Sequence, residues 1–397
     1  MRNAAPASIR TPDGRRLLTK TRIDIAHPRL GDEEWQALRE PIESGWLTQG
    51  PKVQAFEAAF AERHQVGHAL ATTSCTTALH LALAALGTGP GDEVIVPSFT
   101  WVATANVVIY CGATPVLVDV EPETFNIDPA AVTAAVTERT RAVIPVHLFG
   151  LCANMDALRA ALPETVKIVE DAACAAGASH DGTPAGGLGD AAAFSFHPRK
   201  SITTGEGGML TTNDAELSER AAAMRNHGAA IPEEVRVHGP KPYLLPDFDV
   251  LGFNYRMTDL QGAVGLVQLS KLDAFIIERA RWAAWYRDRL GGLSWLHLPE
   301  EPAGGRHAWQ TFVARIDPQS APMPRNEIME RLEAEGISTR PGTHAVHRLG
   351  YYRDRFGFDD ESFPVSRALA DTTLALPLHN RMTEADFVRV ADALLNL

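Results

Sequence analysis

The sequence predicts an α/β protein with a mostly parallel central sheet and a second, smaller α+β domain. Through the middle of the chain, short apolar runs alternate with helical patterns, as in a sheet covered by helices. Several runs are apolar at nearly every position, which is typical of strands buried on both faces. A length of 397 residues also favours more than one domain.

The expected strands of the central sheet share this apolar character. They are Ala69–Thr72, Glu93–Val96, Thr114–Asp119, Arg141–Val146, Lys167–Glu170, Ala191–Phe196 and Gly208–Thr212. The helices expected between them include Thr76–Leu86, Thr100–Tyr110 and Asn154–Ala161. Parallel sheets bind ligands beyond the carboxyl ends of their strands, so the residues that follow each strand are candidates for chemistry.

The pattern of apolar and charged residues changes at about Lys271. The later elements expected are a charged helix, a strand and two further helices, at Leu269–Leu290, Trp309–Ile316, Asn326–Glu335 and Glu384–Leu395. We therefore predict a leader at 1–20, a large domain at 21–270 and a small C-terminal domain at 271–397. The leader is polar and basic and lacks the apolar core of a signal peptide.

Composition excludes several classes of partner. The net charge of −12 argues against nucleic-acid or anionic-membrane binding. No uninterrupted apolar run approaches the roughly 18 residues of a membrane span. The 4 cysteines include no C-x-x-C pair, which disfavours a disulfide framework or a zinc site. Reduced thiols and a cytoplasmic protein are expected.

Four kinds of chemical group follow the expected strands. Asp171 follows Lys167–Glu170, and Lys200 lies in a Gly-rich loop after Ala191–Phe196. Hydroxyl residues at 73–77 open a helix, whose free N–H groups suit a phosphate. Trp101 follows another strand. A lysine that forms an imine, a carboxylate for a pyridinium nitrogen, a phosphate cradle and an aromatic face together match pyridoxal 5′-phosphate (PLP).

Six stretches carry a resemblance to a known family. They are Ser44-Gly-Trp-Leu-Thr-Gln-Gly50, Pro145-Val-His-Leu-Phe-Gly150, Glu170-Asp-Ala-Ala173, Phe194-Ser-Phe-His-Pro-Arg-Lys200, Thr204-Gly-Glu-Gly-Gly208 and Gly252-Phe-Asn-Tyr-Arg-Met-Thr-Asp259. From about Arg22 to the C-terminus the chain resembles the DegT/DnrJ/EryC1/StrS aminotransferases. These are the sugar-aminotransferase branch of the PLP fold-type I enzymes, so the resemblance implies the aspartate aminotransferase-like fold.

The resemblance implies a role for each matching residue. Lys200 would be the Schiff-base lysine and proton carrier, and Asp171 would pair with the pyridinium nitrogen. Trp101 would stack on the cofactor ring. The phosphate would be held by the Cys75 backbone, Thr76, Ser195 and the Asn254 of a neighbouring subunit, which implies a homodimer. Arg256 would lie near the substrate, and Arg340 and His344 are further expected substrate contacts because a diphosphate needs local cations.

Two positions depart from the family pattern. Cys174 stands where the family often has Gln or His, at a position that faces the 3′-oxygen of PLP, and a thiol is a weak donor. Cys75 stands where the phosphate loop often carries Gly. Lys200 itself is kept, whereas a related branch that dehydrates sugars has His there. This favours transamination.

Simpler structural roles compete with these interpretations. Asp171, Thr76 and Ser195 could be helix caps, Trp101 could be core and Asn254 could be a turn residue. His147 is equally a core or a pocket residue. His344 and His347 have a spacing that could bind metal, but no cysteine or carboxylate cluster supports it, so no metal is predicted. Cys174 has no motif that pairs it with a base and is not a predicted nucleophile.

The expected function is an amino transfer in two half-reactions. L-glutamate would convert PLP to pyridoxamine 5′-phosphate, and a keto sugar would then take the amine. By resemblance the acceptor is a nucleotide-diphosphate-linked keto-deoxyhexose. The alternatives are a PLP-dependent dehydratase or eliminase, a keto-cyclitol aminotransferase, and a PLP-binding regulatory protein without turnover.

Overall fold

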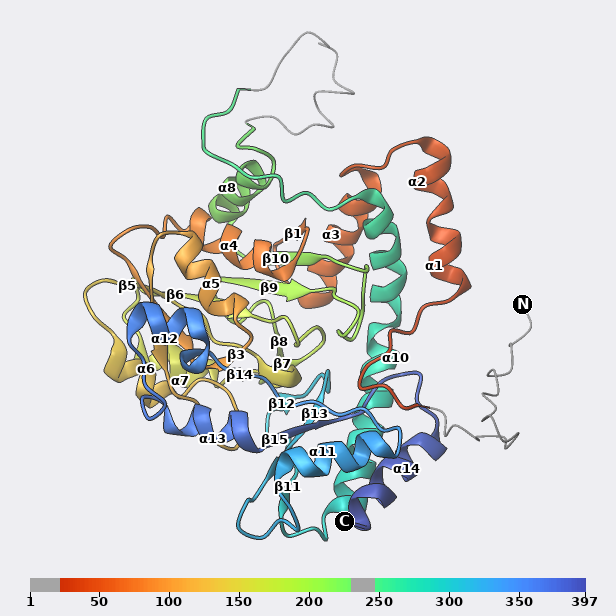
Figure 1. Ribbon diagram of the computed structural model, residues 1–397. Coiled ribbons are helices and arrows are strands. Elements are labelled where there is room, and N and C mark those ends of the chain that lie inside the picture. Colours follow the sequence, from red (N-terminus) through yellow and green to blue (C-terminus); the bar gives the residue numbers. More distant parts are fainter. Residues whose placement is uncertain (1–21, 230–246) are drawn as a thin grey trace.

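The computed structural model describes residues 22–229 and 247–397, and the expected leader lies outside the described residues (Figure 1). A seven-stranded sheet has the order β1-β10-β9-β6-β5-β2-β4. Its strands are β1 (His68–Thr72), β2 (Glu93–Pro97), β4 (Thr114–Val118), β5 (Thr140–Val143), β6 (Lys167–Asp171), β9 (Ala191–Ser195) and β10 (Gly208–Thr212). Each expected strand is present, within a few residues of its expected bounds, so the predicted α/β class is confirmed.

One strand of the sheet runs against the others. The neighbours from β4 through β2, β5 and β6 to β9 pair in parallel, whereas β10 pairs antiparallel with both β9 and β1. A parallel return needs a long crossover, usually a helix. Residues 196–207 between β9 and β10 contain no helix, so the chain turns back directly. Lys200 lies in this turn, at the carboxyl end of β9.

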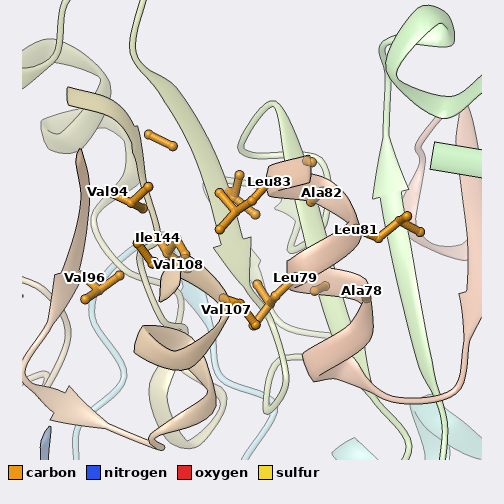
Figure 2. Packing of buried hydrophobic residues seen from close by; sticks show 14 of the residues in the cluster. Ala78, Leu79, Leu81, Ala82, Leu83, Val94, Val96, Val107, Val108 and Ile144 are labelled. Atoms are coloured by element: carbon orange, nitrogen blue, oxygen red, sulfur yellow. The ribbon is translucent and has the colours of Figure 1, made fainter. Parts of the chain in front are cut away.

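Helices cover both faces of the sheet, and strand alternation decides which side chains they meet. From β2, Val94 and Val96 pack in one cluster with α4 (Cys75–Ala85) and α5 (Ala103–Tyr110), as Figure 2 shows. Ile95 lies in a separate cluster with α6 (Pro129–Ala135) and α7 (Met155–Ala161). The other helices of this half are α1 (Asp32–Ala37), α2 (Arg39–Ser44), α3 (Pro51–His64) and α8 (Ala215–Arg225).

The long helix α10 (Asp259–Leu290) begins ten residues before the expected start at Leu269. Thr258 caps it, and Gln261 completes a capping box. Gly262 and Gly265 weaken the helical pattern in the sequence. The structure shows why they are glycines: a Cβ at either position would lie 2.7 Å from α3, at the Val53 amide nitrogen or the Phe56 ring. Close packing on α3 therefore outweighs propensity.

By length and hydropathy α10 could cross a membrane. It is the one such helix in residues 22–229 and 247–397, and 44% of its most apolar stretch is buried. Core helices pass the same test. Phe275 and Ile276 of α10 belong to the core cluster that holds Phe56 of α3, and Figure 1 shows α10 running along the molecule from the large sheet to the C-terminal half. The helix thus has a structural role inside the fold.

The C-terminal half builds its own core around a three-stranded sheet of β11 (Leu296–His297), β13 (Phe312–Ile316) and β15 (Thr373–Leu376). The helices α11 (Arg325–Ala334) and α14 (Glu384–Leu395) pack on it. Ile23 joins this core and pairs with Ile337. The predicted boundary at 270 falls inside α10 and stays a prediction.

Short elements join the two halves. The strand β3 (Phe99–Thr100) pairs with β14 (His344–Ala345), so Thr100 is not in the helix expected at Thr100–Tyr110. The expected strand Trp309–Ile316 starts only at Phe312, because Trp309 has a positive φ of 49°. The remaining strands and α-helices of the described residues are β7 (Ser179–His180), β8 (Thr183–Pro184), β12 (Gly305–Arg306), α12 (Gly350–Phe356) and α13 (Pro364–Thr372).

Candidate active site

The fold brings Lys200, Asp171 and two cysteines together. Asp171 ends β6 and pairs with Ala193 of β9, the strand that leads to Lys200. The Lys200 Nζ donates to the Cys174 Sγ at 3.2 Å. Cys75, at the start of α4, has its Sγ 3.9 Å from the Asp171 Oδ1. These side chains, which come from three separate segments of the sequence, form one cluster at the carboxyl ends of β1, β6 and β9.

The Asp171 carboxylate is buried and has few partners. It accepts hydrogen bonds from the Thr104 hydroxyl at 2.8 Å and from the Ala173 amide at 3.2 Å. Burial raises its pKa although Thr104, Ala173 and the charge of Lys200 act in the opposite direction. Thr104 was not among the predicted site residues. Its signal was its place three residues after Trp101, on the first turn of the helix that follows β2.

Charges in the cluster act on Lys200. Burial opposes the positive charge of its amine, but the hydrogen bond to Cys174 and the charge of Asp171 favour it, and the pKa of Lys200 is raised. Burial raises the pKa of the Cys75 thiol well above its ordinary value, with the Asp171 charge as a second cause. The amine and the carboxylate therefore stabilise each other's charged forms, as two groups serving one bound molecule would.

The N-terminus of α4 lies beside this cluster and could hold an anion. Ser74 caps the helix by accepting from the Thr77 amide at 3.2 Å. The amides of Cys75 and Thr76, in the first turn, have no acceptor within the helix by geometry. A Cβ at Gly208 would lie 2.3 Å from the Ser74 carbonyl carbon, so only glycine lets β10 approach this turn. Ser195 is the direct partner of Gly208 across β9 and β10, and its side chain is half-buried.

Trp101 and His344 form an exposed edge of the candidate site. Trp101 is 60% exposed, which excludes the core alternative. Its ring meets the His344 ring edge-on at 5.4 Å, because β3 and β14 pair there. The Thr104 amide donates to the Trp101 carbonyl at 3.2 Å, which links this edge to the partner of Asp171.

The other predicted substrate and phosphate residues have partners outside the Lys200 and Asp171 cluster. Arg256 pairs with Thr72, next to the cradle, and donates to the Asn226 side chain at 2.6 Å. Asn254 is exposed and its backbone pairs with Asn226. Arg340 is exposed and donates to the Thr339 carbonyl at 2.9 Å. Their described contacts do not reach Lys200, so their predicted roles stay predictions.

The two histidines His147 and His347, weighed above as pocket or metal-binding residues, are buried. His147 is fully buried: its Nδ1 accepts from the Ala153 amide at 3.1 Å, and its Nε2 lies 2.9 Å from the Glu170 carboxylate. Of its two interpretations, the structure favours the core. His347 is buried, with its Nδ1 2.7 Å from the Ser98 hydroxyl.

A possible cation cluster lies elsewhere in the described chain. It consists of Asp156, His180 and Asp181, whose ligand atoms lie within 4.8 Å of one another. Both carboxylate residues are exposed, and such groups are common without an ion. This cluster does not include His344 or His347.

The donor set fits PLP. Lys200 offers an amine that can form an imine, Asp171 a buried carboxylate for a pyridinium nitrogen, and the start of α4 a cradle for a phosphate. A seven-stranded sheet with these groups at its strand ends is the arrangement expected of a PLP enzyme of fold type I. The chain belongs to the DegT/DnrJ/EryC1/StrS aminotransferase family, whose model matches residues 28–395. It is therefore a PLP-dependent aminotransferase.

Similar proteins act in sugar biosynthesis. The chain is 42% identical to the GDP-perosamine synthase of Caulobacter vibrioides over 94% of this chain and 97% of that protein. It is 40% identical to the spore coat polysaccharide biosynthesis protein SpsC of Bacillus subtilis, over 93% of this chain and 95% of that protein.

Solved structures agree with the fold. Spr1654 of Streptococcus pneumoniae, in PLP and pyridoxamine-phosphate forms, matches with TM-scores of 0.87 and 0.88 and 27% identity. These matches cover 94% of this chain and 97% and 98% of the Spr1654 chains. DesI, solved in the presence of its TDP-sugar product, matches with a TM-score of 0.85 and 34% identity over 94% of this chain and 92% of its own.

Proposed function

We propose that this aminotransferase moves the amino group of L-glutamate to a keto-deoxyhexose carried on a nucleoside diphosphate. The observation that carries the proposal is 42% identity to a GDP-perosamine synthase over nearly the full length of both chains. The TDP-sugar product of the similar DesI supports the same class of acceptor. The Lys200 and Asp171 cluster supplies the groups that amino transfer requires.

Each side chain has a task that follows from its position. When bound, PLP supplies the aldehyde that takes up the amino group and the ring that accepts electrons. Lys200, which faces Cys174, would move a proton to and from the substrate carbon through its Nζ. Asp171 would hold a positive charge on the ring nitrogen, and Thr104 would fix the direction of that carboxylate. The first turn of α4, with Thr76 and Ser195, would bind the phosphate.

The exposed part of the site would be completed by a second copy. We propose a homodimer in which Asn254 reaches the phosphate of the neighbouring site and Trp101 lies against the ring. Arg256, Arg340 and His344 would contact the diphosphate and sugar, because arginine matches diphosphate geometry. Free thiols at all four cysteines accord with a cytoplasmic location.

An absorbance spectrum with PLP tests the role of Lys200. We expect wild-type protein to show a yellow band that L-glutamate bleaches, and Lys200→Ala to lack the band. Arg199→Ala is the matched control, since it removes an exposed cation one residue away; it should keep the band. A Lys200→Ala protein with the wild-type band would overturn the assignment. A wild-type band that glutamate leaves unchanged would overturn the proposed donor.

The acceptor is tested separately. Wild-type enzyme with L-glutamate is offered GDP-linked and TDP-linked keto-deoxyhexoses and, as a comparison, the same sugars without the nucleotide. Formation of 2-oxoglutarate with a nucleotide-linked sugar, at a kcat/KM at least about 100-fold above that for the free sugar, is the expected result. Equal rates with the free sugar would contradict the proposal.

A further inference from the structure

The peptide group that joins Arg199 to Lys200 is held from both sides. Its N–H, on Lys200, donates to the His197 carbonyl at 2.8 Å within the turn. Its C=O, on Arg199, accepts from the Gln310 side-chain amide at 2.8 Å. A peptide group is planar, so two hydrogen bonds on opposite edges fix the orientation of the plane and with it the Cα of Lys200. The second bond comes from the C-terminal half of the chain.

Gln310 is itself held in place. Its side-chain oxygen accepts from the Thr311 hydroxyl at 2.8 Å, which leaves the NH₂ group to point at Arg199. Its backbone carbonyl accepts from the buried Arg279 guanidinium at 2.9 Å. Arg279 also donates to Trp309, Leu378 and Asn380. A buried cation shared among these acceptors ties the Gln310 backbone to α10 and to the residues after β15.

The backbone before Gln310 is forced into an unusual conformation. Trp309 has φ 49°, in the left-handed region that a bulky residue rarely adopts. Its amide donates to the His307 Nδ1 at 2.8 Å, and the two rings stack at 4.0 Å. Burial lowers the pKa of His307 to about 3, so this nitrogen is an acceptor at neutral pH.

Gly150 lets the same segment lie against the loop that follows β5. A Cβ there would be 3.1 Å from the amide nitrogens of Trp309 and Gln310. The Gly150 carbonyl accepts from the Ala308 amide at 2.8 Å. Several independent contacts therefore place Gln310 where its amide meets the turn of Lys200.

We propose that Gln310 is a positioning residue that fixes the Lys200 turn from the C-terminal half. The proposal rests on the proposed role of Lys200. Gln310 acts on the reaction through the Arg199–Lys200 peptide and not by touching the substrate. Without its hydrogen bond, Lys200 keeps its chemistry but loses part of its orientation, and proton transfer depends steeply on orientation.

The test compares Gln310→Met, which keeps length and removes the donor, with Gln319→Met, the same change at an exposed site of the same half. We expect Gln310→Met to keep the yellow band and to lower kcat about tenfold, with KM within about twofold, as loss of one oriented hydrogen bond would. Gln310→Glu should lower kcat further, because it turns a carboxylate toward the Arg199 carbonyl. Gln319→Met should have the same yellow band, kcat and KM as the wild type.

A readout without cofactor separates positioning from general damage. In cofactor-free protein, hydrogen exchange of the segment 197–204 should be faster in Gln310→Met than in wild type, while exchange in the core strand β9 should not change. Equal exchange in the segment and kcat within twofold of wild type, in a protein that keeps the band, would overturn this inference alone. Absence of the band in wild type would instead overturn the role of Lys200.

Discussion

Glu170 and Asp171 are neighbours at the end of β6, and their surroundings differ completely. The Glu170 carboxylate accepts from the amides of Gly186, Leu188 and Gly189 at 2.7 to 2.8 Å and lies 2.9 Å from the His147 Nε2. Since the His147 Nδ1 accepts from an amide, its Nε2 carries the proton and donates. Asp171 has a hydroxyl and one amide as strong donors.

The two carboxylates project to opposite faces of the sheet, as alternation requires. Glu170 is a structural group with a donor at each of its acceptor sites, and its hydrogen bonds hold the loop 186–189 against the strand. Asp171 is buried with spare acceptor capacity, and burial raises its pKa. A buried charge without enough partners costs stability, so its presence at a strand end indicates a ligand that supplies the missing partner.

The largest expected effect comes from Asp171→Asn. If Asp171 holds the charge on the cofactor ring, kcat should fall on the order of 10²- to 10³-fold, because a preorganised charge at the reacting group is lost. The folded protein should be as stable as wild type within about 1 kcal/mol, since a poorly solvated charge is removed. Steady-state kinetics and urea denaturation measure the two. Activity within tenfold of wild type would contradict the role of Asp171.

Glu170→Gln should show the reverse pattern, in which stability is lost and the cofactor band is kept. A glutamine has one acceptor oxygen, so two of the four donors now at Glu170 would face an NH₂ group. We expect a loss of about 3 kcal/mol in the free energy of unfolding, measured on cofactor-free protein. Protein that remains folded should keep its yellow band. A stability equal to that of Asp171→Asn would remove the distinction between the two carboxylates.

Thr104→Val tests the surroundings of Asp171 by changing its hydroxyl partner. It removes the hydroxyl that donates to Asp171 and keeps the shape of the side chain, so the pKa of Asp171 should rise further and kcat should fall about tenfold. Thr100→Val removes a hydroxyl that lies 3.1 Å from that of Thr104 and does not itself contact Asp171, so it should lower kcat less than Thr104→Val. Equal effects of both substitutions would argue for packing and against a specific hydrogen bond.

The smallest effect is a pH dependence of stability. In cofactor-free protein the pKa of Asp171 is raised above its ordinary value of 3.8. At a pH between 3.8 and the raised pKa, the folded state therefore binds more protons than the unfolded state. Stability from this group is therefore greatest below pH 3.8 and falls as pH rises through the raised pKa. Urea titrations across that window should show wild type losing stability relative to Asp171→Asn. Parallel curves would contradict a raised pKa.

Much of the fold could be predicted because local patterns and global packing agree. The apolar runs at Val94–Val96 and Ile168–Val169 are strands because strands buried on both faces need apolar side chains at every position. The start of α10 could not be predicted, since its glycines signal packing on α3 and propensity alone counts against a helix there.

The sequence by itself determined which groups stand at strand ends: Lys200 in its Gly-rich turn, Asp171 after an apolar run, and the hydroxyls that open α4. Spacing along the chain is sufficient for that, because a strand delivers its last residue to the sheet edge. Only the tertiary structure decided that Asp171 meets Thr104 while Glu170 is saturated, and that Gln310 reaches the turn of Lys200. Those contacts join segments tens to more than a hundred residues apart, and no local pattern encodes which distant donor fills a carboxylate.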